Sequence, residues 1–282
     1  MEEIKKRYVF TSLEKTLPLF IESIGYNPYE LSFSRPDGYP YFHWLQTVEG
    51  EGTVTFSGQN STLKAGNGVL LMPFTPHSYS PSNDKWSTMY LTFGGAAVDA
   101  ILDSLEINYS ALYAETNKDL FAALVENMII NVEKMPEFSG LEFSNDLYHF
   151  IIKLKKYGKI NNQPSLSQYY AKISPVVNWI ERKYADNIGL PEMAEQGKMS
   201  PQYLNTLFRD TFGISPYSFL IQIRIRESKK HLISNYNASL KEISKLVGFN
   251  DVSHFVATFR KKEGMTPAKY RSLHQSQKIE IY

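Results

Sequence analysis

Residues 201–216 read PQYLNTLFRDTFGISP, and residues 252–267, which lie 51 positions further along the chain, read VSHFVATFRKKEGMTP. Both segments space their apolar residues as one face of a helix does, and both end in Gly-x-[Ser/Thr]-Pro, which stops a helix. A short helical segment precedes each of them, at residues 190–196 and 240–247. The repeat therefore predicts two copies of one unit, made of a helix, a tight turn and a second helix.

The second helix of each copy carries the kind of polar face that a helix-turn-helix protein places in the major groove of DNA. Ser200 can cap the first of these helices, with Pro201 at its first position, and Asn250 or Asp251 can cap the other. The side chains expected to pack inward are Leu204, Leu207, Phe208, Phe255 and Phe259. The predicted DNA contacts are Gln202, Asn205, Thr206, Arg209, Ser253, His254, Val256, Ala257, Arg260 and Lys261.

The chemistry and charge of this part of the chain suit DNA. Gln and Asn can hydrogen-bond adenine through two atoms, whereas Arg and Lys contact guanine or phosphate. Residues 174–282 contain 16 Lys and Arg against 10 Asp and Glu, a net charge of +6, whereas residues 1–173 contain 14 and 19, a net charge of −5. This asymmetry indicates a polyanionic partner for the second half, with ordinary variation of surface charge as the alternative.

The run ISKLVGFNDVSHF at residues 243–255, followed by FRKKEGMTP at residues 259–267, resembles the signature of the AraC/XylS family of transcription regulators. Residues 174–273 as a whole are similar to the paired helix-turn-helix domain of that family. The resemblance implies that the two recognition helices enter successive major-groove segments on one face of the duplex. Many members carry Arg at the positions of Thr206 and Ala257, so base readout here is expected to depend more on Gln202, Asn205, His254 and DNA shape.

Between about residues 31 and 93, the pattern changes to short aromatic and β-branched segments. Residues 41–48 read YFHWLQTV, and turns are predicted at residues 49–52 (EGEG), 57–60 (SGQN) and 65–68 (AGNG). Pro73 closes the next apolar segment, and one more strand is predicted at residues 86–93. Short strands at this spacing predict a small antiparallel barrel or sandwich.

Beyond residue 95 the spacing of apolar residues becomes helical. Two amphipathic helices within residues 117–157 can cover the open side of the barrel or pair with another subunit. The polar stretch 158–173 is a predicted linker, and Ser174-Pro175 is the predicted start of the next helix. The predicted parts are therefore a sensing and dimerisation domain at residues 1–157, the linker, and a DNA-binding domain at residues 174–282.

Residues 20–95 resemble the cupin-like sensor domain of sugar-responsive members of the same family, through RPDGY at 35–39, EGEG at 49–52, LKAG at 63–66 and PHSY at 76–79. The resemblance implies an α+β protein, with a cupin-like β-barrel followed by helices and then an all-α domain with two helix-turn-helix units. It assigns sugar contacts to Arg35 and Tyr79. Aromatic rings pack on sugar rings, and polar side chains hydrogen-bond their hydroxyls. The further predicted ligand contacts are His43, Trp86, Thr88 and Tyr90.

Other classes of protein are disfavoured. The chain has no cysteine, so it has no disulfide, no Cys-type zinc site and no thiol nucleophile. A metal-dependent cupin enzyme needs closely spaced His ligands, but Leu45 occupies the second position after His43. Because Gly-rich phosphate loops and Ser/His/Asp motifs are also missing, we expect no catalytic site, no metal and no cofactor. With neither a signal peptide nor a long apolar run, we expect a cytoplasmic protein without a membrane partner.

The sequence therefore predicts a ligand-responsive, sequence-specific DNA-binding transcription regulator, an activator of carbohydrate-utilisation genes. The expected partners are a double-stranded DNA operator, a sugar effector, RNA polymerase and a second copy of the chain in a homodimer. The alternative is a constitutive or partner-regulated DNA-binding regulator whose barrel serves only dimerisation.

Overall fold

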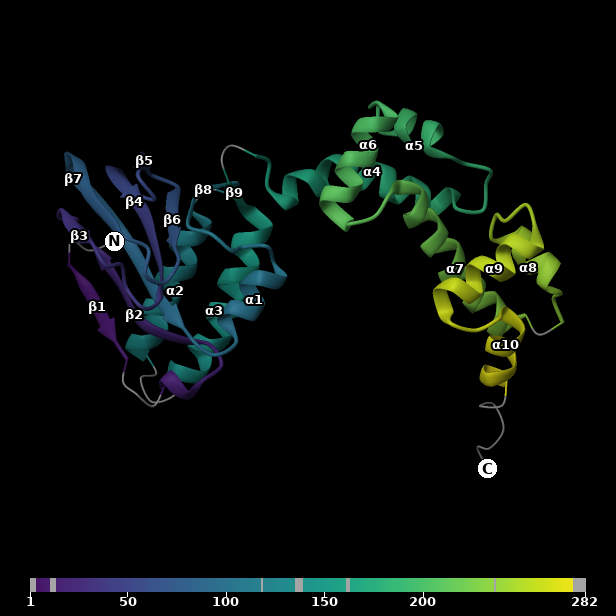
Figure 1. Cartoon of the computed structure of the whole chain (residues 1–282), viewed down its shortest axis with the longest axis horizontal. Coiled ribbons are helices and arrows are strands. Elements are labelled where there is room, and N and C mark those ends of the chain that lie inside the picture. Colours follow the sequence, from purple (N-terminus) through teal and green to yellow (C-terminus); the bar gives the residue numbers. More distant parts are fainter. Residues whose placement is uncertain are drawn as a thin grey trace. The chain divides into compact units, whose positions relative to one another are not determined.

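The computed structural model describes residues 4–10, 14–117, 119–134, 139–160, 163–235 and 237–275. The chain divides into two compact units, Met1–Gln168 and Tyr169–Tyr282 (Figure 1). The first unit is rich in strands and the second is helical, which confirms the predicted α+β class.

The first unit is built on one antiparallel sheet, in which the long strands β4 (Phe42–Phe56) and β7 (His77–Gly94) form the central ladder. The remaining strands are β1 (Lys6–Val9), β2 (Phe20–Asn27), β3 (Phe33–Arg35), β5 (Gln59–Lys64), β6 (Asn67–Leu71), β8 (Ala111–Glu115) and β9 (Gly158–Ile160). Strands β2 and β6 flank one end of the central ladder, and β3 and β5 flank its other end. The helices of the unit are a 3-10 turn (Glu14–Thr16), α1 (Val98–Ser104), α2 (Leu120–Lys134) and α3 (Ser139–Tyr157).

The predicted turn at residues 49–52 was wrong, because β4 runs through it without ending. Gly50 adopts φ +74° and the pairing with β7 changes register here, so the glycines form β-bulges inside one long strand. A Cβ on Gly52 would stand 2.5 Å from the indole of Trp86, which shows how closely that ring covers the strand. Of the turn predicted at residues 57–60, Ser57 and Gly58 form a turn, whereas Gln59 and Asn60 already belong to β5.

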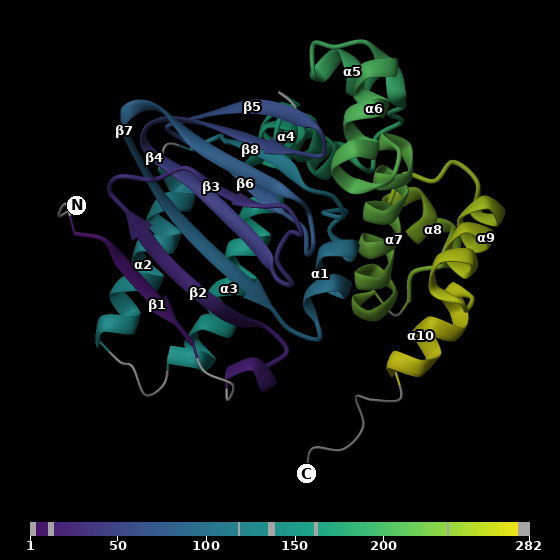
Figure 2. The same ribbon diagram turned by 60° about the vertical axis from the view of Figure 1, so that its left-hand side comes forward.

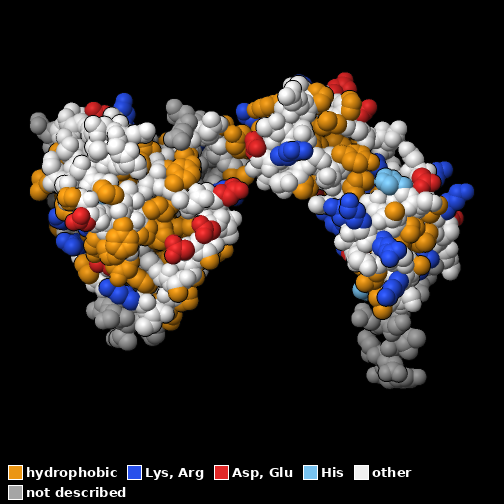
Figure 3. Space-filling model, in the orientation of Figure 1, with side chains coloured by type: hydrophobic (Ala, Val, Ile, Leu, Met, Phe, Trp, Pro, Cys, Tyr) orange, Lys and Arg blue, Asp and Glu red, His pale blue; other side chains and the backbone are white. Residues whose placement is uncertain are grey.

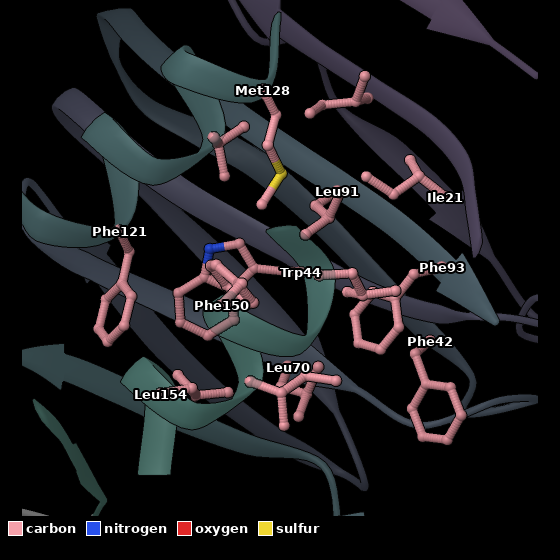
Figure 4. Packing of buried hydrophobic residues seen from close by; sticks show 14 of the residues in the cluster. Ile21, Phe42, Trp44, Leu70, Leu91, Phe93, Phe121, Met128, Phe150 and Leu154 are labelled. Atoms are coloured by element: carbon pink, nitrogen blue, oxygen red, sulfur yellow. The ribbon is translucent and has the colours of Figure 1, made fainter. Parts of the chain in front are cut away.

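One face of the sheet is covered by α2 and α3 (Figure 2). Trp44 lies at the centre of this contact, with its ring centroid 5.5 Å from those of Phe121 in α2 and Phe150 in α3 (Figure 4). All three side chains are fully buried. Of the two roles predicted for the amphipathic helices, the structure shows the first, a cover for the sheet. The opposite face has an apolar cluster of its own, formed by Leu45, Val54, Leu63, Val69, Leu71 and Trp86.

The second unit contains two helix-turn-helix pairs connected by one long helix, α7 (Pro216–Ser234). The pairs are α5 (Leu190–Gln196) with α6 (Pro201–Phe212), and α8 (Leu240–Leu246) with α9 (Val252–Glu263). The unit also includes α4 (Leu166–Lys183), which starts three residues before the division between the units, and α10 (Pro267–Gln275). Among the described residues, no helix combines the length and apolar character of a membrane-spanning segment.

The start predicted for α4 was wrong. The helix begins at Leu166, eight residues before Ser174, and Pro175 lies inside it. A proline has no N–H to donate to the carbonyl four residues earlier, which here is that of Ala171. The Ser174 hydroxyl donates to this carbonyl instead, at 3.1 Å, so the helix continues. The predicted linker 158–173 consequently contains strand β9 and the first part of α4.

Candidate DNA-binding surface and ligand site

The helices α6 and α9 begin and end with the signals seen in the sequence. The Ser200 hydroxyl accepts a hydrogen bond from the Tyr203 N–H at 3.2 Å, and an Asp251 carboxylate oxygen accepts one from the His254 N–H at 2.7 Å. Each helix ends at a left-handed glycine, Gly213 at φ +69° and Gly264 at φ +74°. The predicted caps and stops are confirmed, with Asp251 rather than Asn250 as the cap of α9.

On α6, the apolar and polar faces lie as predicted. Leu204, Leu207 and Phe208 are buried in the first helix-turn-helix core. The predicted DNA contacts on this helix stay accessible: Gln202, Thr206 and Arg209 are exposed, and Asn205 is half-buried. The Thr206 hydroxyl donates to the Gln202 carbonyl at 3.2 Å, so it is already bonded within the helix.

On α9, Phe255 and Phe259 are fully buried, while the polar positions face outward. Ser253, His254, Ala257, Arg260 and Lys261 are exposed, and Val256 is half-buried. A shallow hollow brings most of them together, lined by Val252, Ser253, Val256, Ala257, Arg260, Lys261 and Thr266. Thr266, from the Gly-x-Thr-Pro stop, was not among the predicted contacts.

The basic character of the second unit is visible at its surface. Figure 3 shows several Lys and Arg side chains over the part formed by α7 to α10, on a face where Asp and Glu are few. Arg260, Lys261 and Lys262 stand in the last turn of α9, where cations also interact favourably with the helix dipole. Positive charge at this surface favours contact with the phosphates of a DNA backbone.

The second candidate site lies on the face of the sheet opposite α2 and α3. His43 and His77 meet there, with ring centroids 6.2 Å apart and ring planes 14° from parallel. The His43 Nδ1 and the Thr92 hydroxyl are hydrogen-bonded at 2.9 Å. Burial, with smaller contributions from the positive charge of Arg35 and from His77, lowers the pKa of His43 to about 3, so this imidazole is neutral at pH 7.

Arg35 stands beside His77 on the neighbouring strand. Its guanidinium carbon lies 3.9 Å from the centre of the Tyr39 ring, within cation–π range. Among the described residues, its buried Nη1 atom has no hydrogen-bond partner and Arg35 forms no ion pair. Such a group usually has a partner when it is buried.

His77 complements this free donor. Its Nδ1 lies 2.7 Å from the Thr75 carbonyl, which can only accept, so Nδ1 carries the proton. Burial lowers the pKa of His77, so the ring is neutral and Nε2 is an acceptor. Nε2 is also buried, and no residue that the structure describes hydrogen-bonds to it. Arg35 and His77 therefore offer one unused donor and one unused acceptor on adjacent strands.

Aromatic side chains extend this polar pair. Tyr79 stacks on Phe33, with centroids 5.5 Å apart, and contacts Trp86 edge-on at 5.9 Å. The Tyr90 ring lies 6.0 Å from that of His43. Burial raises the pKa of Tyr90 to about 12 and raises that of Tyr79 as well, so both hydroxyls stay protonated.

Trp86 and Thr88, also predicted as ligand contacts, already have partners within the protein. The Trp86 indole N–H donates to the Thr47 hydroxyl at 3.1 Å, and the side chain is 1% exposed. The Thr88 hydroxyl donates to the carboxylate of Glu30 at 2.5 Å, which also accepts from the Asn27 amide at 2.6 Å. Glu30 was missed in the sequence, where a lone carboxylate before a short strand carries no signal.

The described residues contain no group of three or more His, Cys, Asp or Glu side chains placed to hold a metal ion. The Nδ1 atoms of His43 and His77 meet the Thr92 hydroxyl and the Thr75 carbonyl rather than a carboxylate.

Both parts of the chain match known protein families. Residues 22–149 match the family described as AraC-like ligand binding domain, and residues 193–272 match one described as helix-turn-helix domain. Together these matches include both candidate sites.

Similar proteins match over most of their length. The raffinose operon transcriptional regulatory protein RafR of Pediococcus pentosaceus is 26% identical over 235 residues, 81% of this chain and 83% of RafR. The Msm operon regulatory protein of Streptococcus mutans is 24% identical over 229 residues, 79% of this chain and 81% of that protein. The HTH-type transcriptional activator RhaS of Escherichia coli is 22% identical over 246 residues, 84% of this chain and 87% of RhaS.

Proposed function

The chain belongs to the AraC family of DNA-binding transcription regulators, and we propose that it activates carbohydrate-utilisation genes when a sugar binds inside its N-terminal domain. The relatives support this reading by their names, which refer to regulators of the raffinose and Msm operons and to a transcriptional activator. They are regulators rather than enzymes, which fits the expectation of a protein without catalytic activity.

One observation carries the sugar proposal: the free donor of Arg35 and the free acceptor of His77, side by side on adjacent strands. A sugar hydroxyl accepts one hydrogen bond and donates another, so a single hydroxyl can satisfy both groups. Tyr79 and Tyr90 supply aromatic surface and two further hydroxyls. We assign ligand contact to Arg35, His43, His77, Tyr79 and Tyr90. Trp86 and Thr88, which lie on β7 between Tyr79 and Tyr90, are assigned to support these side chains.

For the operator, we assign base contacts to Gln202, Asn205 and His254 and phosphate contacts to Arg209, Arg260 and Lys261. These side chains are exposed or half-buried on α6 and α9. We also propose that the protein acts in the cytoplasm as a homodimer and contacts RNA polymerase when bound at its operator.

A regulator needs a physical route from ligand to DNA-binding helices, and α4 offers one. The Thr116 hydroxyl, directly after β8, donates to the Tyr157 carbonyl at the end of α3 at 2.6 Å, and its oxygen lies within hydrogen-bond distance, 2.9 Å, of the Ser165 hydroxyl before α4. Further along α4, Ile173 belongs to the core of the first helix-turn-helix. The sugar must bind one arrangement of this region more tightly than another, because equal affinity for both shifts no population.

Titration calorimetry on the full chain tests the sugar proposal, with a panel of pentoses, hexoses and raffinose-type oligosaccharides. We expect at least one saccharide to bind the wild type, and Arg35→Met to lose about tenfold or more of the affinity because it removes hydrogen bonds from a charged donor. Lys64→Met is the matched control, since Lys64 is an exposed cation on β5. If no saccharide binds, the barrel serves dimerisation or another regulator, and the sugar proposal falls.

A further inference from the structure

The second unit has two separate apolar cores, one for each helix-turn-helix. The first contains residues of α4, α5 and α6, and the second contains residues of α8 and α9. The connecting helix α7 contributes to both, because Leu220 and Ile223 pack in the first core, whereas Ile221 and Ile225 pack in the second. The offset between the recognition helices α6 and α9, meaning their separation and relative orientation, therefore depends on the contacts that join the two cores around α7.

Arg224 lies on α7 among these side chains and is buried, with 6% of its surface exposed. Its Nε donates to the Tyr184 carbonyl at 2.7 Å, and its Nη2 donates to the Asp186 carbonyl at 2.8 Å. Both carbonyls follow directly after α4, at the end of the helix where the dipole is negative. The guanidinium thus ties α7 to the helix that packs in the first core.

The second helix-turn-helix reaches the same carbonyl segment. Gly248, in the turn between α8 and α9, has φ +87°, and a Cβ there would stand 2.7 Å from the Tyr184 oxygen and 2.9 Å from the Ala185 oxygen. The next residue, Phe249, lies with its ring 5.8 Å from the Arg224 guanidinium and 5.5 Å from the ring of His254 on α9. Residues 184–186 therefore contact α7 and the turn before the second recognition helix at once.

We propose that Arg224 is a positioning residue that sets the offset between α6 and α9, and with it the half-site spacing that the protein accepts on DNA. This inference rests on the proposed function, since both helices must bind one duplex. The planar fork of Arg holds two carbonyls in set directions, which the single flexible ammonium of Lys does not do. One added base pair moves a half-site by about 3.4 Å and turns it by about 35°, so a rigid offset discriminates against it.

The experiment first uses the full wild-type chain to select its binding sequence from random duplex DNA. Duplexes are then made with one base pair inserted or removed between the half-sites, and others with one half-site scrambled. Fluorescence anisotropy gives each Kd. All titrations use one salt concentration, because affinities measured at different salt concentrations are not comparable. For Arg224→Met we expect affinities for single half-sites within about twofold of wild type, but a loss of about tenfold in the preference for the native spacing.

Two more variants and a control accompany this one. Arg224→Lys is expected to lose part of the preference for the native half-site spacing. Gly248→Ala inserts a Cβ against the Tyr184 and Ala185 carbonyls, so it is expected to change the dependence of affinity on spacing by displacing the turn before α9. These two carry the test if Arg224→Met does not fold by circular dichroism. Lys230→Met removes one positive charge from an exposed position on α7, where Lys230 pairs with Glu227 of the same helix, and is expected to keep the wild-type profile.

Three results would overturn the inference. One is an unchanged dependence of affinity on half-site spacing in the folded Arg224 and Gly248 variants. Another is an equal loss of affinity of these variants for single half-sites and for complete sites. The third is selection of one half-site alone by the wild type, which leaves the DNA-binding function intact. Selection of no sequence at all would instead contradict the DNA-binding function on which the inference rests.

Discussion

The imidazole ring of His43 stacks on that of His77, although the two residues belong to opposite ends of the β4–β7 ladder. His77 pairs with Phe56, which follows His43 by 13 positions on β4, a separation of about 43 Å along a flat strand. The rings are nevertheless 6.2 Å apart, so the ladder curls over and encloses its inner face. This closure brings the candidate ligand-binding residues together and desolvates both histidines.

The first prediction concerns acid stability. Because the folded-state pKa of His43 is about 3 and the ordinary value is 6.5, the unfolded chain binds a proton at this site between those limits and the folded chain does not. The free energy of unfolding should therefore fall as the pH drops below about 6.5, by up to about 1.4 kcal/mol per pH unit from this group. Well above pH 6.5, His43 should make no contribution to the pH dependence of the free energy of unfolding.

His43→Gln provides the comparison, since a side-chain amide can still hydrogen-bond Thr92 but does not titrate. Urea unfolding at pH 7, 6 and 5, followed by tryptophan fluorescence, should show a shallower pH dependence in the variant. Carboxylates titrate in the same range in both proteins, so the difference between the slopes is the readout. Equal slopes would mean that His43 is not held neutral by burial.

The second prediction concerns base readout by α6. Replacement of Gln202 or Asn205 by Ala should relax the sequence preference at the contacted base pair, at a loss of about 1–3 kcal/mol of discrimination. Binding-site selection with each variant measures this directly. Unchanged selectivity in both variants would contradict the assignment of α6 as a reading helix. Asp210→Ala, at an exposed position on the same helix, should leave the preference as it is.

Arg260 should behave differently, because it is assigned to phosphate. Arg260→Ala is expected to weaken binding to every sequence by a similar factor and to reduce the slope of log K against log salt by about 1. Anisotropy titrations at several salt concentrations, on the selected site and on unrelated DNA, provide the measurement. A loss confined to the selected site would assign Arg260 to a base instead.

The fourth prediction concerns the packing of α3 on the sheet. Phe150 is fully buried against Trp44 and Phe121, so Phe150→Ala should destabilise the first unit by about 3–5 kcal/mol. Tyr148→Ala, on the same helix at a position 47% exposed, should cost less than about 1 kcal/mol. Urea unfolding followed by fluorescence compares the two, and similar losses would show that Phe150 contributes no more to the core than Tyr148 does.

Local signals accounted for most of what could be predicted. The caps Ser200 and Asp251 and the glycines Gly213 and Gly264 act within one helical turn, so the limits of α6 and α9 are readable from neighbouring residues. Local signals also failed where another local contact intervened. Pro175 predicted a helix start, but the Ser174 hydroxyl bonds the carbonyl that the proline leaves free, and α4 continues.

The sequence by itself determined the repeated helix-turn-helix units and their outward polar faces, because helical periodicity and capping act over a few residues. Only the tertiary structure decided which polar groups meet. Glu30 accepts a hydrogen bond from Thr88, which lies 58 positions further along the chain, and Arg224 donates to carbonyls about 40 positions before it. His43 contacts His77 because the β4–β7 ladder curls. Such pairs depend on strand register and on the packing of whole elements, and no short pattern of residues specifies either of them.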